Sequence, residues 1–200
     1  MIQPSPFLLA LDMRGKPVLV VGSGGEAILR ASALKEAGAA VLLIAPSPEA
    51  QLLEWAAREG VSLTERAPSE SDLDGMWLAI LADQDAELAE RLGRAASARR
   101  VLFCAVDQPI WNSFAHVALA RAGALRVGFS SSGRAPALVS ALRREFTRLF
   151  EEAELSAFVE RLAKLRESLP PEKRAEKMRA LAAQVRLTGR LELPQGDSSE

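Results

Sequence analysis

The chain has 200 residues, 48% of them hydrophobic, enough for one substantial domain with a smaller part attached. Its 25 basic and 26 acidic residues nearly cancel and form no basic stripe of the kind that a nucleic-acid partner requires. No apolar run approaches the roughly 20 residues that span a bilayer, and no basic residue precedes the apolar stretch at the start, as a secretory signal would require. A single cysteine, Cys104, and a single histidine, His116, exclude an internal disulfide and a His/Cys zinc site within one chain. We therefore expect a cytoplasmic protein with no nucleic-acid or membrane partner and no metal site.

The first half of the chain alternates strand-like and helix-like segments, the pattern of a parallel sheet covered by helices. Continuous apolar runs such as PVLVVG indicate strands that are buried on both faces. Between these runs the apolar residues recur at helical spacing, as Ala27, Ala31 and Leu34 do. The strands are predicted at 17–22, 40–45, 61–64, 76–82 and 101–106, and the helices at 25–38, 48–59 and 85–98. The predicted fold class is α/β, with a Rossmann-type parallel sheet and helices on both faces.

After Asp107 the pattern changes from alternation to a hairpin followed by helices. FAHVALAR (114–121) and ALRVGFSS (124–131) are strand-like, and the short Ala122–Gly123 link between them is typical of a hairpin. From Pro136 onward the spacing is helical, with a break at Pro170–Pro171. Because an isolated two-stranded hairpin is marginal in water, a homodimer partner is expected to cover it. We predict an NAD-binding Rossmann domain at 1–112, a dimerisation region at 113–150, a small helical domain at 151–193 and a flexible tail at 194–200.

The segment GSGGEA at the end of the first predicted strand matches the dinucleotide fingerprint G-x-G-x-x-G/A. Gly22 permits the tight turn, Gly24 allows a pyrophosphate to approach the backbone, and Ala27 allows close packing of helix on strand. The helix N-terminus adds free N–H donors for the phosphates. The alternative is a tight turn without a ligand, but the order strand, glycines, helix, strand favours a nicotinamide dinucleotide. The second strand ends Ala45-Pro46-Ser47 with no acid before Glu49 and no arginine, so these residues alone leave NAD and NADP open.

Several segments together resemble the N-terminal module of siroheme synthases, the precorrin-2 dehydrogenase/sirohydrochlorin ferrochelatase family. The resemblance runs from about Phe7 to about Arg144 and begins with FLLALDMRGKPVLVVGSGG. IAPS at the second strand end is similar to the family's own non-acidic ending. WLAILA at 77–82, VDQP at 106–109 and SSSGRAP at 130–136 follow in the family's order and spacing. The last two are the most specific, because a generic Rossmann protein has no reason to carry them.

The resemblance implies an NAD-dependent oxidation of precorrin-2 to sirohydrochlorin, in many members followed by insertion of ferrous iron, in a homodimer. It places the catalytic aspartate at Asp107, which would accept the proton that leaves when a hydride is removed. Donors in the serine loop and its arginine would hold the carboxylates of the tetrapyrrole. The predicted substrate-binding residues are Ser130, Ser131, Ser132, Gly133 and Arg134. The predicted cofactor-binding residues are Gly22, Ser23, Gly24, Gly25, Glu26, Ala27, Pro46, Ser47, Ala82 and Asp83.

Each of these interpretations has an alternative. Asp107 could cap a turn before Pro109, and the serine loop could only begin the helix at Pro136. The chain also departs from the family pattern at Leu29, at Ala89 and at Glu26. Glu26 is unusual because it places a negative charge beside the predicted phosphate-binding turn. A nucleotide-sensing regulatory module and a paralogue that has lost its chemistry are the rival hypotheses for the whole chain.

Overall fold

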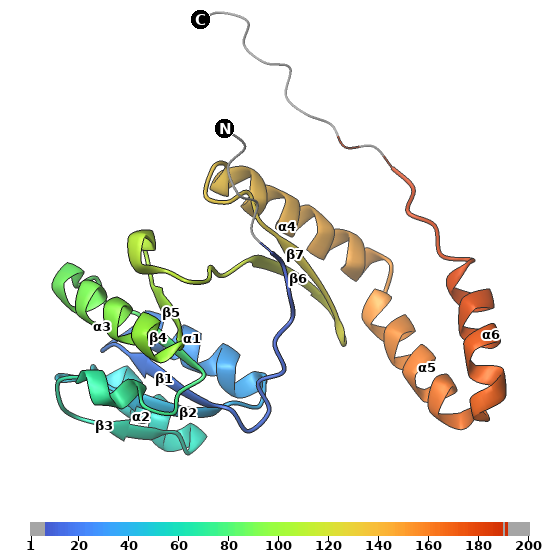
Figure 1. Ribbon diagram of the computed structural model, residues 1–200. Coiled ribbons are helices and arrows are strands. Elements are labelled where there is room, and N and C mark those ends of the chain that lie inside the picture. Colours follow the sequence, from blue (N-terminus) through green and yellow to red (C-terminus); the bar gives the residue numbers. More distant parts are fainter. Residues whose placement is uncertain (1–6, 190, 192–200) are drawn as a thin grey trace, which may run out of the picture. The chain divides into compact units, whose positions relative to one another are not determined.

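The computed structural model describes residues 7–189 and 191, and the chain divides into two compact units (Figure 1). Unit 1 extends to His116 and unit 2 begins at Val117. Each unit is described by itself below. The predicted tail at 194–200 lies outside the described residues.

Unit 1 is built on a five-stranded parallel sheet in the order β3-β2-β1-β4-β5 (Figure 1). The order reverses direction between β1 and β4, as in doubly wound dinucleotide-binding folds. This sheet confirms the predicted α/β class and its five strands. The strands are β1 Pro17–Val21, β2 Ala40–Ile44, β3 Ser62–Thr64, β4 Leu78–Leu81 and β5 Leu102–Ala105. The helices are α1 Gly25–Glu36, α2 Ala50–Glu59 and α3 Ala86–Arg99, with the 3-10 turns η1 Glu70–Leu73 and η2 Pro109–Trp111.

Helices pack on both faces of this sheet, because alternate residues of the central strands point in opposite directions. On β1, Leu19 and Val21 join the cluster that contains Leu92 of α3. Val20 joins the opposite cluster, which contains Ala31 of α1 and Trp55 of α2. β1 and β4 are therefore covered on both sides, which explains why their sequences are continuously apolar.

The free edge of β5 is covered by side chains rather than by another strand. The Asn112 side chain accepts from the Ala105 N–H at 2.6 Å and donates to the Ala105 carbonyl at 3.1 Å. Ser113 binds Phe103 in a similar way, with its side chain and its backbone. The Phe103 N–H donates to Ser113 Oγ at 2.8 Å, and the Phe103 carbonyl accepts from the Ser113 N–H at 2.9 Å. These bonds satisfy backbone groups that would otherwise be open to strand addition.

The strand predicted at 114–121 is too long at its start, since β6 covers only Ala118–Ala122. Phe114 instead packs against the cluster that contains Val18 and Ile80 of unit 1. Its ring meets the ring of His116 edge-on, with centroids 5.4 Å apart. Burial of Phe114 in the first unit competes with strand formation there, and the alternating sequence does not reveal this.

Unit 2 consists of the antiparallel hairpin β6–β7 and three helices. β7 covers Leu125–Phe129 and follows a tight turn at Gly123, which has φ +55°. This confirms the predicted hairpin and the helices after it: α4 Pro136–Glu152, α5 Leu155–Ser168 and α6 Pro171–Ala182. α4 packs on the hairpin, and Phe146 meets Phe129 with ring centroids 5.1 Å apart. Among the described residues of this unit only Ala120 and Ala122 are buried.

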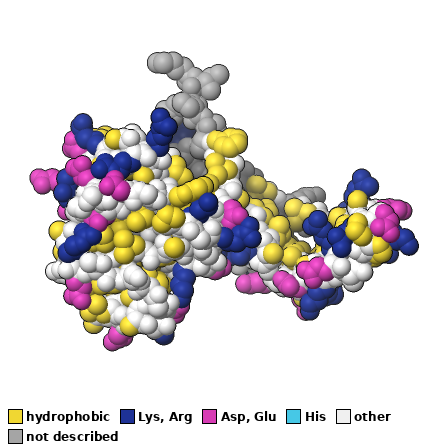
Figure 2. All heavy atoms as spheres, turned by 60° about the horizontal axis from the view of Figure 1, so that its bottom comes forward, with side chains coloured by type: hydrophobic (Ala, Val, Ile, Leu, Met, Phe, Trp, Pro, Cys, Tyr) yellow, Lys and Arg dark blue, Asp and Glu magenta, His cyan; other side chains and the backbone are white. Residues whose placement is uncertain are grey.

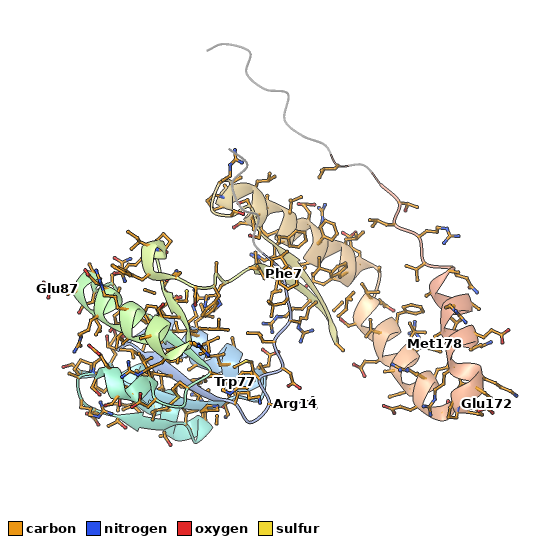
Figure 3. All side chains as sticks on the ribbon, viewed as in Figure 1. Phe7, Arg14, Trp77, Glu87, Glu172 and Met178 are labelled. Atoms are coloured by element: carbon orange, nitrogen blue, oxygen red, sulfur yellow. The ribbon has the colours of Figure 1, made fainter. Side chains whose placement is uncertain are left out.

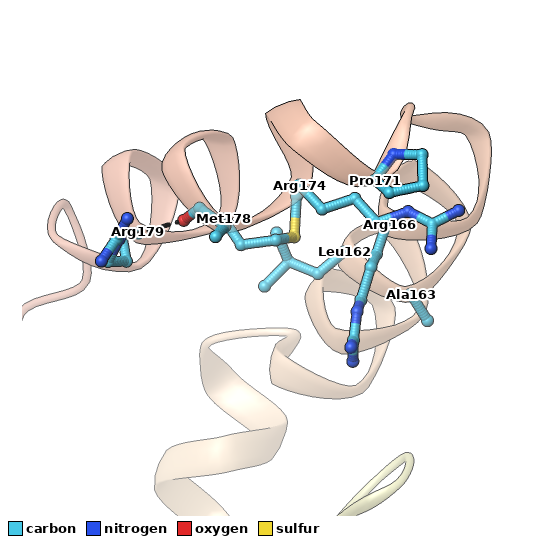
Figure 4. Close-up of a pocket in the computed structure, with 8 residues that line it drawn as sticks. Leu162, Ala163, Arg166, Pro171, Arg174, Met178 and Arg179 are labelled. Atoms are coloured by element: carbon cyan, nitrogen blue, oxygen red, sulfur yellow. Dashed lines mark hydrogen bonds between the residues drawn. The ribbon is translucent and has the colours of Figure 1, made fainter.

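Residues of α5 and α6 line an open groove of about 760 Å³ (Figure 4). Met178, labelled on α6 in Figure 3, lies in it with Leu162 of α5. Arg174 donates to the Leu169 carbonyl at 2.7 Å and Arg179 to the Ala175 carbonyl at 3.2 Å. The groove contains none of the predicted site residues.

Charges of both signs are interspersed over the face seen in Figure 2, in keeping with the net charge of −1. Within residues 7–189 and 191, no helix is both long and apolar enough to cross a membrane.

Candidate functional site

The predicted cofactor residues of unit 1 gather at one edge of the sheet. Gly22 to Ala27 follow β1, Pro46 and Ser47 follow β2, and Ala82 and Asp83 follow β4. These three strands are neighbours in the sheet and run parallel, so their carboxyl ends lie side by side. Ligands of open α/β sheets bind at such an edge, where the strand order reverses.

Gly22 is the most enclosed residue of the β1–α1 turn. A Cβ atom on Gly22 would lie 2.8 Å from Ala82 Cβ and 3.2 Å from Ala27 Cβ. Its backbone has φ +157°, which side chains rarely adopt. The glycine and the two alanines of the predicted site therefore depend on one another, because each leaves room for the close approach of β1, β4 and α1.

Asp83 fixes the same turn from the end of β4. Its carboxylate accepts hydrogen bonds from the Ser23 N–H, at 3.1 Å to each oxygen, and from the Ser23 hydroxyl at 2.8 Å. Asp83 is half-buried, so these bonds form in partial shelter from water. The structure thus brings together two predicted cofactor residues and shows that Asp83 uses the backbone donor of Ser23.

The N-terminus of α1 offers backbone donors to an anion. Its N-cap residue, Gly24, has no side chain that could take up the N–H groups of the first turn. The first N–H groups of a helix have no partner within the helix, and they point toward any anion placed there. The lack of a Cβ at Gly22 and Gly24, together with these donors, fits the pyrophosphate of a dinucleotide.

Glu26, in the first turn of α1, forms an ion pair with Arg30 one turn later. Arg30 Nη2 lies 2.5 Å and Nε 2.7 Å from Glu26 Oε1. The pairing offsets the negative charge that makes Glu26 unusual beside a phosphate-binding turn.

A residue outside the predicted set, Glu49, also reaches the glycine turn. A Cβ on Gly24 would lie 2.6 Å from Glu49 Oε1, so the carboxylate rests directly against the Gly24 backbone. Glu49 is the N-cap residue of α2, and its N–H donates to the Ser23 carbonyl at 2.8 Å. The sequence did not single out Glu49, because the acidic residue that binds the ribose in dinucleotide-binding folds usually lies closer to the end of β2. Pro46 and Ser47 are exposed between β2 and Glu49.

Asp107 lies just beyond β5, on the same edge of the sheet. It is exposed, and its backbone has φ +59°, a left-handed conformation that Asp tolerates better than most residues. Its Oδ2 accepts a weak hydrogen bond from Gln84 Nε2 at 3.4 Å. Gln108 in turn donates to the Asp83 carbonyl at 3.4 Å. Reciprocal contacts therefore link the loops after β4 and β5, which places Asp107 next to the predicted cofactor residues.

The predicted substrate residues belong to unit 2, in the loop between β7 and α4. Ser131 Oγ accepts from the Ala135 N–H at 2.9 Å, and Ser130 Oγ from the Ser132 N–H at 3.3 Å. Ser132 and Gly133 have φ +55° and +77°. Two of the serines thus shape the loop before α4, while Arg134 is exposed.

No group of three or more His, Cys, Asp or Glu side chains is arranged to hold a metal ion in the described part of the chain. Cys104 is buried in β5, and burial raises the pKa of its thiol. The thiol therefore stays protonated near neutral pH and behaves as a small core residue.

A family model described as "Putative NAD(P)-binding" matches residues 9–118. The match covers the whole β1–β5 sheet with the glycine turn, and it confirms the predicted nicotinamide dinucleotide class of cofactor.

Several curated relatives of this chain carry the name siroheme synthase. The protein of Nitrosococcus oceani is 33% identical over 143 residues, which cover 72% of this chain and 31% of that protein. The protein of Pseudomonas fluorescens is 37% identical over 132 residues, which cover 66% and 28%. The chain thus spans about a third of the length of these relatives. Their similarity to it confirms the resemblance that the sequence motifs indicated.

A solved structure described as SirC, precorrin-2 dehydrogenase, has the same fold. It superposes with a TM-score of 0.76 at 20% identity and covers 88% of this chain and 89% of its own. The similarity includes the hairpin and helices after the sheet and confirms the predicted architecture.

Proposed function

Because the chain belongs to this NAD(P)-binding family, we propose that it is an NAD-dependent dehydrogenase that oxidises precorrin-2 to sirohydrochlorin in siroheme biosynthesis. Similarity to siroheme synthases supports this substrate. The observation that carries the proposal is the position of Asp107, exposed at the end of β5 and linked through Gln84 to the loop that bears Asp83.

The dinucleotide would be held at the carboxyl ends of β1, β2 and β4. Gly22 and Gly24 allow close approach of the backbone, and the N-terminus of α1 supplies donors for the pyrophosphate. Asp83 keeps the turn in place through Ser23. NAD, when bound, supplies the acceptor for the hydride that leaves the substrate.

Asp107 would act as the general base. Oxidation of the macrocycle releases a proton as well as a hydride, and an exposed carboxylate can accept that proton. The left-handed backbone at Asp107 turns the chain sharply after β5. Insertion of ferrous iron into sirohydrochlorin also releases protons, from pyrrole nitrogens, and we propose the same base for that step.

Residues 130–134 would bind the carboxylates of the tetrapyrrole. Arg134 can form a bidentate contact with a carboxylate, and the serines present hydroxyl and backbone donors. Two serine hydroxyls already bind the loop's own backbone, so Arg134 is the principal candidate.

The functional unit would be a cytoplasmic homodimer. Unit 2 has few buried residues of its own, and a hairpin with so small a core gains stability from a second copy. We propose 1–112 as the cofactor domain, 113–150 as the dimerisation region and 151–193 as the helical domain.

The first test is to mix the protein with precorrin-2 and NAD and to follow the absorbance of NADH and of sirohydrochlorin. Asp107→Asn should lower kcat by about a hundredfold or more, the usual contribution of a general base, and leave the Kd for NAD unchanged. The control is Glu87→Gln, an exposed carboxylate at the start of α3 (Figure 3), which should retain full activity.

Full activity of Asp107→Asn would contradict the assigned base. NAD binding without oxidation of precorrin-2 would contradict the dehydrogenase and favour a regulatory module. Iron insertion is measured separately, from sirohydrochlorin and ferrous iron under anaerobic conditions. It should fail in Asp107→Asn if one base serves both steps.

A further inference from the structure

The end of β2 lacks the acid that usually distinguishes NAD from NADP. In dinucleotide-binding folds an Asp or Glu near this strand end binds the 2′-hydroxyl of the adenosine ribose. Here β2 ends at Ile44 and is followed by Ala45, Pro46 and Ser47. The site therefore needs another acceptor for the ribose hydroxyls if it is to bind NAD selectively.

Glu49 is anchored beside the glycine turn by its own backbone. Its N–H donates to the Ser23 carbonyl at 2.8 Å. Its carbonyl accepts from the Leu52 N–H at 2.9 Å in the first turn of α2. The main chain of Glu49 is thus bound both to the β1–α1 turn and to α2, which fixes where its side chain begins.

The Glu49 carboxylate lies beside the glycine turn, on the segment that follows β2. Its Oε1 would be 2.6 Å from a Cβ on Gly24, and in dinucleotide-binding folds the adenosine ribose is bound next to the end of β2. Gln51 Nε2 donates to Oε2 at 2.5 Å and steadies the carboxylate. Glu49 is nevertheless exposed, so its remaining acceptor positions can reach a ligand.

The charges around the turn favour a ribose that carries no phosphate. Arg30, on α1, already pairs with Glu26, and Asp83 adds a further carboxylate bonded to Ser23. A 2′-phosphate placed against Glu49 would bring two like charges together, whereas a 2′-hydroxyl donates a hydrogen bond to the same oxygen.

We propose that Glu49 is the residue that binds the adenosine ribose hydroxyls and selects NAD over NADP. This rests on the dinucleotide site of the proposed function but not on its substrate. Glu49 replaces the acid at the strand end by reaching back from the N-terminus of α2.

The test compares dissociation constants, measured by calorimetry and by fluorescence titration with NADH and NADPH. The wild-type chain should bind NAD more tightly than NADP. Glu49→Ala should raise the Kd for NAD by about tenfold to a hundredfold, the loss of a hydrogen bond to a charged group. Its Kd for NADP should stay the same or fall, so the preference for NAD collapses.

Two further variants separate charge from hydrogen bonding and from general effects on α2. Glu49→Gln keeps an acceptor without the charge and should lose less NAD affinity than Glu49→Ala while still gaining NADP affinity. Glu54→Ala removes an exposed carboxylate from the same helix and should leave both constants unchanged. Circular dichroism and thermal unfolding verify that all variants fold alike.

An unchanged ratio of the two constants in Glu49→Ala would overturn the proposal, as would a wild-type chain that binds neither dinucleotide. A selective wild type whose selectivity depends on Glu49, but which does not oxidise precorrin-2, would support the role of Glu49 and refute only the proposed substrate.

Discussion

At the scale of single residues, the glycine turn is determined by what surrounds it. Ala27 of α1 approaches Gly22 from one segment of the chain, and Ala82 and Asp83 approach it from another, the segment that follows β4. The two alanine Cβ atoms are attached to backbones that the sheet and α1 hold in place. A side chain at position 22 therefore cannot be accommodated by a change of rotamer.

Gly22→Ala should lower the free energy of unfolding by about 1–3 kcal/mol, the usual effect of overpacking, and raise the Kd for NAD. Gly25→Ala is the matched control for the effect on stability. A Cβ on Gly25 would meet only Gln51 Nε2, at 3.9 Å, and Ala favours the helix. Urea unfolding of the two variants checks this, and equal stabilities would show that the turn is not as tightly packed as described.

The sequence predicted the glycines and Asp83 because these residues follow strands in recognisable motifs. It did not predict the partners that those residues find. Glu49 stands beyond the expected distance from β2, and only the path of residues 45–49 returns it to Gly24. Ala89, which departs from the family pattern, lies in α3 and is fully buried in the core cluster that contains Leu19 of β1, so packing explains its small side chain.

At the scale of elements, strand and helix types were predictable from periodicity, whereas several ends were not. Met76 and Trp77 are apolar but lie before β4, and Lys16 stacks over the Trp77 ring at 3.9 Å. The backbone of Trp77 still bonds to Pro17 and Leu102, so the predicted strand exceeds β4 at this end chiefly by Met76.

The η1 turn was not predicted, although Ser69 and Asp72 form a capping box at its start, which is a local sequence pattern. The contact of Arg66 with Asp72, by contrast, is not revealed by local sequence.

Asp72 holds η1 to the segment that follows β3. Its carboxylate accepts from Arg66 at 2.5 and 2.8 Å and from the Ser69 N–H at 2.7 Å. The bonds from Arg66, with the smaller contribution of the Ser69 bonds, lower the pKa of Asp72 from 3.8 to about 2. A carboxylate with a depressed pKa stabilises the folded state above its unfolded-state pKa and loses that effect as the pH falls through its folded-state pKa.

Asp72→Asn should therefore lower the free energy of unfolding by about 1 kcal/mol at neutral pH, since Arg66 is half exposed and solvent screens the pair. The difference from wild type should shrink as the pH falls from about 4 to about 2. Urea titrations at several pH values measure it, with Glu54→Gln as the exposed control. A difference that persists at the lowest pH would show that the effect is not electrostatic.

At the scale of the whole molecule, the two units differ in how much they bury. Unit 1 has a sheet covered on both faces, whereas the described part of unit 2 buries only two alanines of β6. Periodicity predicted the helices of unit 2 but does not show what their apolar faces contact. A stable second unit therefore points to a partner surface, and a second copy of the chain is the proposed one.

The full chain should sediment with the mass of two copies at micromolar concentration. Because a dimer is favoured by mass action, the midpoint of thermal unfolding should rise with protein concentration. Analytical ultracentrifugation and a concentration series of unfolding curves measure both. A monomer whose unfolding is independent of concentration would contradict the dimer.

The bonds of Asn112 and Ser113 to β5 also bear on the loop that carries Asp107. This loop leaves the sheet after Ala105 and is bound back to the same strand through the Asn112 and Ser113 side chains. It is therefore tethered at both ends to one rigid strand. The conformational entropy of these residues is lost during folding and not when substrate arrives. The proposed base would then meet its substrate already oriented, with little reorganisation left for the reaction itself.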